Sequence, residues 1–225
     1  MQTALARAGW PDPGDRQAAV FRRLRVSVLI VLLLLLAGWA GPAARAADTG
    51  TGPVEELRGL VDRARAVLDD GSLASKERDR QFADILRAGF DFPTISRLAL
   101  GRAWRMATTE QRERFVDLFT RYLFATYAQR LGGTSGRDIR IEGSRKVRED
   151  VIVSSFVTGG RSEFAVDWRM RRDDNRWRVI DLVIEQVSML VTQRSELASI
   201  IEHNGGRIEG LLAHLGEAIA AMQAN

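Results

Sequence analysis

The hydrophobic period of this chain changes twice along its length, and this change constrains the fold more than any other feature. Apolar residues recur at helical spacing up to about residue 131, alternate as in strands between about 139 and 184, and return to helical spacing from 193 to 222. A period near 3.6 indicates amphipathic helices, and a period of two indicates strands. Segregation of this kind predicts an α+β fold, with helices packed on one face of a four-stranded, mainly antiparallel sheet.

The clearest helix is predicted from Thr108 to about Leu131. Thr108 and Gln111 form a capping box at its start. Its apolar face carries Phe115, Phe119, Tyr122, Leu123 and Tyr127 at intervals of three and four. Shorter helices are predicted at 54–68, 76–88 and 94–100 before it, and at 193–203 and 208–222 near the C-terminus.

Four strands are predicted at 139–146, 151–158, 162–172 and 177–184. Gly159-Gly160 is a two-residue hairpin signal between the second and third strands. The third strand alternates most cleanly, with one apolar face formed by Phe164, Val166, Trp168 and Met170. The second and fourth strands are apolar on both faces in places, so we expect them in the interior of the sheet.

The N-terminus has the three parts of a secretory signal peptide. Three arginines lie between residues 22 and 25, no charge follows from Val26 to Ala44, and Ala44-Arg45-Ala46 offers a small-x-small cleavage site. The sequence therefore predicts a signal peptide at 1–46 and a single exported domain at 47–225, which places the protein in the periplasm. The alternative is a retained signal anchor, although the strongly apolar part is short for a membrane span.

Charge and composition exclude several classes of function. The net charge is +4, but residues 1–46 hold six of the 33 basic and two of the 29 acidic side chains. The predicted mature chain is therefore neutral, with 27 of each, and we expect no nucleic-acid partner. The chain has no cysteine, which excludes thiolate catalysis and cysteine-ligated metal sites.

Catalytic signatures are absent from the sequence, so we predict no catalytic residue, metal site or cofactor. The glycine-rich segment 132–136 lies between a helix and a strand, the reverse of the order that a phosphate loop needs. The two histidines, His203 and His214, are expected at surface or capping positions. Asp167 and Asp181 are the candidate general bases of an enzyme hypothesis, but a structural role is the favoured interpretation for both.

Two blocks of sequence resemble the MlaC family, also called the toluene-tolerance auxiliary family. The first runs from Gly89-Phe-Asp-Phe-Pro-Thr-Ile-Ser-Arg-Leu-Ala-Leu-Gly-Arg-Ala-Trp104 through the long helix to Tyr127-Ala-Gln-Arg-Leu131. The second runs from Trp177-Arg-Val-Ile-Asp-Leu-Val-Ile-Glu-Gln-Val-Ser-Met-Leu190 to about Ile201. The chain departs from the family pattern at Gln186, where a glycine is usual, and at 132–138, which lacks a tyrosine-containing stretch.

The resemblance implies a periplasmic carrier of phospholipid rather than an enzyme. Its fold would enclose an apolar cavity for acyl chains between helices and sheet. Its partners would be an inner-membrane ABC transporter complex with an MCE-domain subunit and an outer-membrane lipoprotein complex, and its role would be to maintain outer-membrane lipid asymmetry. A branch of the family resembles hopanoid-pathway proteins, so a polycyclic lipid is the alternative cargo.

We predict the lipid-binding residues from helical phase and strand alternation. They are the inward positions of the long helix and the apolar face of the third strand, namely Phe119, Leu123, Tyr127, Phe164, Val166, Trp168 and Met170. Two other hypotheses stay open at this point. One is an enzyme that uses Asp167 or Asp181 as a base, and the other is a periplasmic adaptor with a fully packed core.

Overall fold

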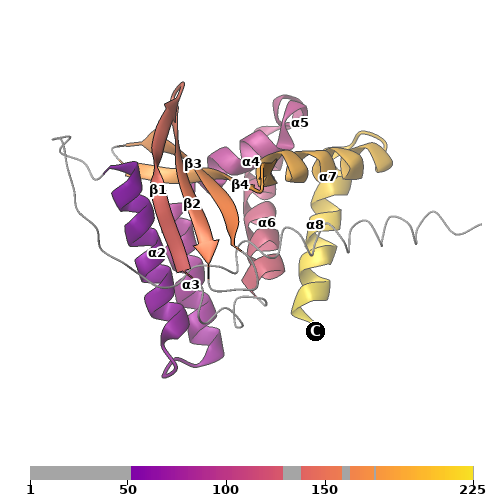
Figure 1. The fold of residues 1–225 in the computed structure, drawn as a ribbon. Helices are drawn as coiled ribbons and strands as arrows, with labels where there is room; N and C mark the ends of the chain where they lie inside the picture. Colours follow the sequence, from indigo (N-terminus) through magenta and orange to yellow (C-terminus); the bar gives the residue numbers. More distant parts are fainter. Residues whose placement is uncertain (1–51, 129–137, 159–162, 175, 225) are drawn as a thin grey trace, which may run out of the picture.

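A computed structural model describes residues 52–128, 138–158, 163–174 and 176–224, without the side chains of residues 127 and 128. Within these ranges, five helices come first, then five strands, then two helices. Figure 1 shows their arrangement. The helices are α2 (Pro53–Asp69), α3 (Ser75–Gly89), α4 (Phe92–Leu100), α5 (Arg102–Met106), α6 (Thr109–Ala128), α7 (Met189–His203) and α8 (Ile208–Gln223). The strands are β1 (Asp138–Val147), β2 (Asp150–Thr158), β3 (Phe164–Asp173), β4 (Arg176–Ile184) and β5 (Val187–Ser188).

The strands form one antiparallel sheet in the order β1-β2-β3-β4-β5. This confirms the α+β fold class and the four predicted strands, with β2 and β4 in the interior of the sheet. The fifth strand was not predicted. It has only two residues, pairs with the end of β4, and makes one edge of the sheet.

One face of the sheet packs against α2 and α3. On β3 the alternation is as predicted: Val166, Trp168 and Met170 are buried, and their neighbours along the strand are half-buried. These residues share a hydrophobic cluster with the inward faces of α2 and α3, including Leu57 and Phe82. We call this group the sheet cluster. At the end of α3, a Cβ on Gly89 would overlap the side chain of Leu60 on α2, so a larger residue at position 89 would force Leu60 to shift.

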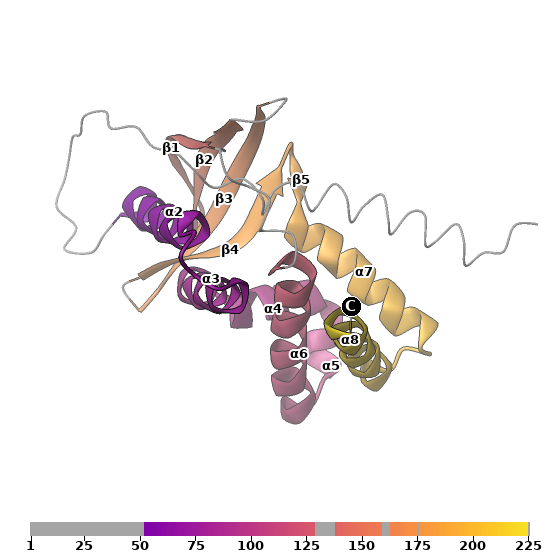
Figure 2. The same ribbon diagram turned by 90° about the horizontal axis from the view of Figure 1, so that it is seen from below.

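A second hydrophobic cluster is formed by helices alone. It joins α4, α5, α6, α7 and α8 around buried residues such as Phe115, Phe119, Leu197 and Leu211. We call it the helical cluster. Figure 2 shows this group beside the sheet and the α2–α3 pair, with α7 leading away from β5. Sequence periodicity predicted α4, α6, α7 and α8, but it predicted neither the short α5 nor that these helices build a core of their own.

The other face of the sheet carries charged side chains. Asp150 is only 1% exposed and accepts hydrogen bonds of 2.6 Å from the Nε of both Arg169 and Arg171. Asp167 forms a 3.3 Å ion pair with Arg145 on β1. This face is therefore polar, and the apolar interior of the protein lies on the side of the helices.

The predicted capping box at the start of α6 is confirmed. The backbone N–H of Gln111 donates to the Thr108 hydroxyl at 3.2 Å, and the backbone N–H of Thr108 donates to the Gln111 side chain at 3.0 Å. The reciprocal pair satisfies backbone donors at the helix start. It fixes the beginning of the helix that carries Phe119 and Leu123.

Three predictions lie outside the described residues. They are the signal peptide at 1–46, the Gly159-Gly160 hairpin and the glycine-rich segment at 132–136. Within the ranges that the structure does describe, no helix is both long enough and apolar enough to cross a membrane.

Candidate functional site

An apolar cavity of about 100 Å³ lies between helices and sheet. Its walls come from the end of α3, from α4, α6 and β4, and from the first turns of α7. Asp181 and Gln193 are the polar side chains among its lining residues. The apolar lining residues are Leu86, Phe90, Phe92, Ile95, Phe119, Leu123, Phe124, Ile180, Leu182, Ile184, Met189 and Leu190.

The cavity follows the boundary between the two hydrophobic clusters. Leu86, Leu182 and Ile184 belong to the sheet cluster, whereas Phe119 and Leu190 belong to the helical cluster. Each cluster is packed against its own elements, and the space that remains lies where the two meet. A space lined mainly by apolar groups suits an apolar ligand and offers water few partners.

The segment Gly89 to Pro93 positions the aromatic wall of the cavity. The backbone N–H of Asp91 donates to the carbonyl of Val179 on β4 at 3.0 Å, which ties this segment to the sheet. The Asp91 side chain then accepts from the N–H of Thr94 at 2.9 Å and caps α4. These bonds hold Phe90 and Phe92 on either side of the cap, facing the cavity.

Three phenylalanine rings of this wall are in contact with one another. The ring centroids of Phe90 and Phe92 are 5.9 Å apart, and those of Phe92 and Phe124 are 5.2 Å apart. Phe92 begins α4 and Phe124 lies on α6, so their contact links these two helices. Such distances are typical of favourable aromatic pairs.

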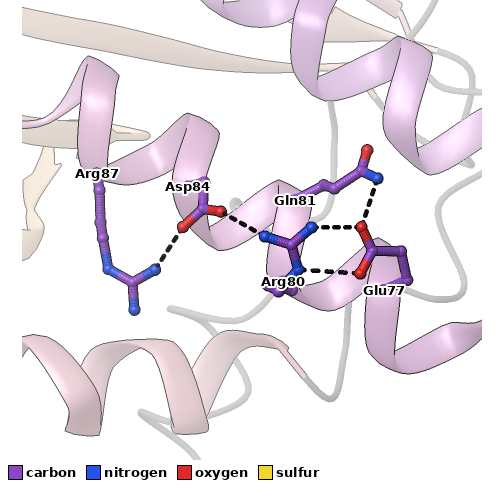
Figure 3. A network of polar contacts seen from close by, with 5 residues as sticks. All are labelled: Glu77, Arg80, Gln81, Asp84 and Arg87. Atoms are coloured by element: carbon purple, nitrogen blue, oxygen red, sulfur yellow. Dashed lines mark hydrogen bonds and ion pairs between the residues drawn. The ribbon is translucent and has the colours of Figure 1, made fainter.

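A network of polar and charged side chains on α3 ends at this wall. Figure 3 shows Glu77, Arg80, Gln81, Asp84 and Arg87 in sequence along the helix. Arg80 donates to Glu77 and Asp84, and Arg87 donates to Asp84 at 2.9 Å. The hydrogen bonds from Arg80 and Gln81 lower the pKa of Glu77 to about 2. At the far end, the Arg87 guanidinium carbon lies 4.6 Å from the centroid of the Phe124 ring.

The buried carboxylate of the cavity, Asp181, holds two structural elements together. It accepts a 2.6 Å hydrogen bond from the Ser188 hydroxyl and a 2.9 Å bond from the backbone N–H of Leu190. Burial raises the pKa of Asp181, and these hydrogen bonds oppose the rise. Asp181 thus anchors the start of α7 to β4, which accounts for a buried acidic side chain without a catalytic role.

The structure brings together two of the seven predicted lipid-binding side chains at the cavity. Phe119 and Leu123 line it from α6. The predicted residues of β3 lie elsewhere: Val166, Trp168 and Met170 are buried in the sheet cluster, and Phe164 packs against that cluster. The indole N–H of Trp168 donates to the hydroxyl of Ser155 at 2.9 Å inside this core. The side chain of Tyr127 is outside the described residues.

Several cavity residues were not among the predicted site residues. Phe90 and Phe92 lie in the Gly89–Pro93 segment, which the sequence marks as a break between helices. Their aromatic character within the MlaC-like block was the available signal. Met189 and Leu190 follow Ser188, whose hydroxyl caps α7 by accepting from the N–H of Val191 at 3.1 Å.

The remaining candidate residues lie at the surface. Asp167 belongs to the charged face of the sheet and pairs with Arg145. His203 and His214 are exposed, and the Nδ1 of His203 lies 2.7 Å from the carbonyl oxygen of Ser199 in its own helix. Among the described residues, no group of three or more metal-ligating side chains comes together.

Comparison with known proteins identifies relatives over most of the described fold. Residues 58–217 match the MlaC protein family. Over 112 residues the chain is 27% identical to the intermembrane phospholipid transport system binding protein MlaC of Haemophilus influenzae, a match covering 47% of this chain and 52% of that protein. The chain thus spans about half the length of this curated relative.

The fold also resembles that of a solved structure. The phospholipid-binding protein from Ralstonia solanacearum, determined in complex with a phospholipid, superimposes with a TM-score of 0.67 and 26% sequence identity. The match covers 75% of this chain and 97% of that chain.

Proposed function

The chain belongs to the MlaC family, and from this premise we propose that it is a lipid carrier that holds phospholipid tails in the cavity between its two hydrophobic clusters. The observation that carries the proposal is the apolar lining of that cavity, to which α3, α4, α6, β4 and α7 all contribute. The Ralstonia solanacearum structure supports the same cargo, because that protein was solved in complex with a phospholipid.

The volume of the cavity bears on how a lipid would enter. A volume of about 100 Å³ is well below the roughly 300 to 1,000 Å³ of typical ligand pockets. Two acyl chains would therefore need more space than the cavity offers in this conformation. The boundary between the clusters is the place where such space opens with least loss of packing, because each cluster keeps its own contacts when the two move apart.

Apolar burial alone is enough to hold such a cargo. Each buried methylene contributes about 0.8 kcal/mol, so two long acyl chains need few directed polar contacts. Of the two polar lining groups, Asp181 is bonded to Ser188 and Leu190, and the Gln193 amide donates to Glu196 at 2.9 Å. We propose that the protein is a carrier without enzymatic activity and that Asp181 is a structural group.

We further propose that lipid contact on α6 is made by Phe119 and Leu123, which line the cavity, and by Tyr127 one turn beyond Leu123. The four predicted residues of β3 stay in the proposal as a second layer. Val166 pairs with Ile184 and Trp168 with Leu182 in the sheet, and both partners line the cavity. A tail that reached past β4 would meet these side chains next.

The cellular role in our proposal follows that of the family. The chain would be exported by a cleavable signal peptide at 1–46 and would act in the periplasm as a single domain at 47–225. There it would shuttle phospholipid between an outer-membrane lipoprotein complex and an inner-membrane ABC transporter complex with an MCE-domain subunit, and so maintain outer-membrane lipid asymmetry.

Native mass spectrometry of the protein purified from a bacterial periplasm, followed by lipid extraction, tests this proposal. We expect a stoichiometric phospholipid adduct. A polycyclic adduct would assign the alternative hopanoid cargo, which the three phenylalanine rings of the wall would also accommodate. An apo mass that persists after incubation with phospholipid vesicles would contradict the carrier function and favour the adaptor hypothesis.

A further inference from the structure

One cation lies over the aromatic wall of the cavity. Arg87 follows Leu86, which lines the cavity, and its guanidinium carbon lies 4.6 Å from the centroid of Phe124, which lines it as well. The Arg87 side chain is 52% exposed, and Phe124 is half-buried. The guanidinium therefore stands where the apolar lining meets solvent.

The hydrogen bonds of the α3 network leave Arg87 with free donors. Arg80 uses all three of its nitrogens, Nε and Nη2 on Glu77 and Nη1 on Asp84. Arg87 uses only Nη1, which donates to Asp84 at 2.9 Å (Figure 3). A guanidinium has five N–H donors, so within the described part of the chain Arg87 keeps Nε and Nη2 available.

The two arginines of this network have different numbers of carboxylate partners. Asp84 lies between two arginines and pairs with both, at 3.4 Å to Arg80 and 2.9 Å to Arg87. Arg80 has a second carboxylate, Glu77, whereas Arg87 has only the shared one. A planar guanidinium that stacks on a ring and retains two adjacent donors is well matched to a phosphate, because it can bind two oxygens at once.

We propose that Arg87 binds the phosphate of the lipid whose tails occupy the cavity. This inference rests on the proposed function and assigns the position of the headgroup: the tails lie against Phe124 and its neighbours, and the phosphodiester meets Nε and Nη2 of Arg87 at the edge of the ring. Inorganic phosphate shares this chemistry, but a lipid phosphate is delivered by its tails at high effective concentration.

The test compares two lipids with the same tails. Protein purified from the periplasm is incubated with vesicles that contain tail-labelled phosphatidylglycerol or tail-labelled diacylglycerol, which lacks the phosphate, and the label that elutes with the protein is measured. Wild type should take up phosphatidylglycerol about tenfold better, as one charge-assisted contact predicts. Arg87→Gln should reduce this ratio to near one, while uptake of diacylglycerol stays unchanged.

Arg80→Gln is the matched control, since Arg80 lies on the same helix, pairs with the same Asp84 and is similarly exposed. It should keep the wild-type ratio. An unchanged ratio in Arg87→Gln, or an equal loss in both variants, would overturn the proposal. Suppression of phosphatidylglycerol uptake by millimolar inorganic phosphate would make this a site for free phosphate and overturn the lipid assignment. Uptake of neither lipid by wild type would instead overturn the proposed function itself.

Discussion

The Ser188 hydroxyl donates a 2.6 Å hydrogen bond to Asp181 and thereby joins the start of α7 to β4. The second carboxylate oxygen of Asp181 accepts from the N–H of Leu190, and the Ser188 oxygen accepts from the N–H of Val191. Two of these bonds fix the first turn of α7 against β4, which lines the cavity, and the third caps α7. Leu190, in that turn, lines the cavity too.

Replacing Asp181 by alanine should destabilise the protein. The substitution leaves the Ser188 hydroxyl and the Leu190 N–H without their acceptor, and buried donors left unsatisfied cost about 1–3 kcal/mol each. We expect the free energy of unfolding, measured by urea denaturation, to fall by about 3 kcal/mol. Asp167→Ala is the control, because Asp167 forms an ion pair at the surface, and it should cost less than about 1 kcal/mol. Equal losses would refute the anchoring role of Asp181.

Asp150 should make stability depend on pH in the acid range. Burial alone would raise the pKa of Asp150, but hydrogen bonds and charge from Arg171 and Arg169 outweigh it, and the pKa lies below the ordinary 3.8. The folded state therefore binds this proton less readily than the unfolded state. The resulting stability is present above pH 3.8 and is lost as the pH falls through the folded pKa.

Comparison with Asp150→Asn isolates this contribution. At pH 7 the variant should be about 2 kcal/mol less stable than wild type, less than for a fully buried pair because both arginines are partly exposed. The difference should shrink as the pH is lowered below 3.8. Glu149→Gln, at the exposed neighbouring position that also pairs with Arg171, should change stability little at any pH. A constant gap between wild type and Asp150→Asn across the acid range would argue against this account.

Leu123→Trp should reduce lipid loading without unfolding the protein. Leu123 is half-buried and lines the cavity, so a larger ring there would occupy the space of the tails. We expect the lipid-bound fraction in native mass spectrometry to fall severalfold, with a melting temperature within about 5 °C of wild type. Leu118→Trp, on the same helix and half-buried but away from the cavity lining, should load normally. Normal loading of Leu123→Trp would remove this residue from the site.

Gln186→Gly should stabilise the protein. Glu185 and Gln186 connect β4 to β5 with φ angles of +44° and +68°, in the left-handed region where a side chain is unfavourable by roughly 1–2 kcal/mol. Two-residue hairpins with positive φ at both positions favour glycine at the second. We expect a gain of about 1 kcal/mol in urea denaturation. Gln186→Ala, which keeps the Cβ, should show no such gain. A gain of equal size in Gln186→Ala would mean that the effect comes from removing the glutamine side chain beyond Cβ and not from the backbone conformation.

The same turn explains a departure noted in the sequence. The family pattern has a glycine at this position, and the backbone conformation of Gln186 accounts for that preference. Here the neighbouring side chain supports the turn, since Glu185 accepts a 2.6 Å hydrogen bond from the N–H of Ala165 and its own N–H donates to the Ala165 carbonyl at 3.1 Å. The resemblance to the family pointed to Gln186 as an unusual residue, and the structure relates it to a positive φ angle.

Much of the fold could be predicted because hydrophobic period decides between helix and strand. The four long strands and the capping box of α6 are found where the sequence indicated. The start of α7 was predicted at 193, four residues after its position at Met189. The residues Met189, Leu190 and Val191 are all apolar and show no helical period, and the sequence alone did not identify Ser188 as the N-cap. The two-residue β5 is too short to produce an alternation.

The candidate site was predictable only in part, because a local pattern shows which side chains are buried but not what they pack against. Alternation on β3 identified Val166, Trp168 and Met170 as buried, but it does not say which helix covers them. They pack against α2 and α3, whereas the cavity lies one strand further on, beside β4. Helical phase was more informative on α6, because it predicted that Phe119 and Leu123 point inward, and both line the cavity. No local pattern could show that the cavity lies at the boundary between two clusters.

The two edges of the sheet determine whether copies of the protein can associate through their strands. Unpaired strand edges can recruit strands of other molecules and start aggregation. Here β5 offers only two residues, and β1 carries exposed charges at Arg140, Arg145 and Lys146 and an irregularity in register next to Gly143. Intermolecular strand pairing is therefore disfavoured at both ends of the sheet, so the lipid uptake that we propose would not lead copies of the protein to polymerise through their backbones.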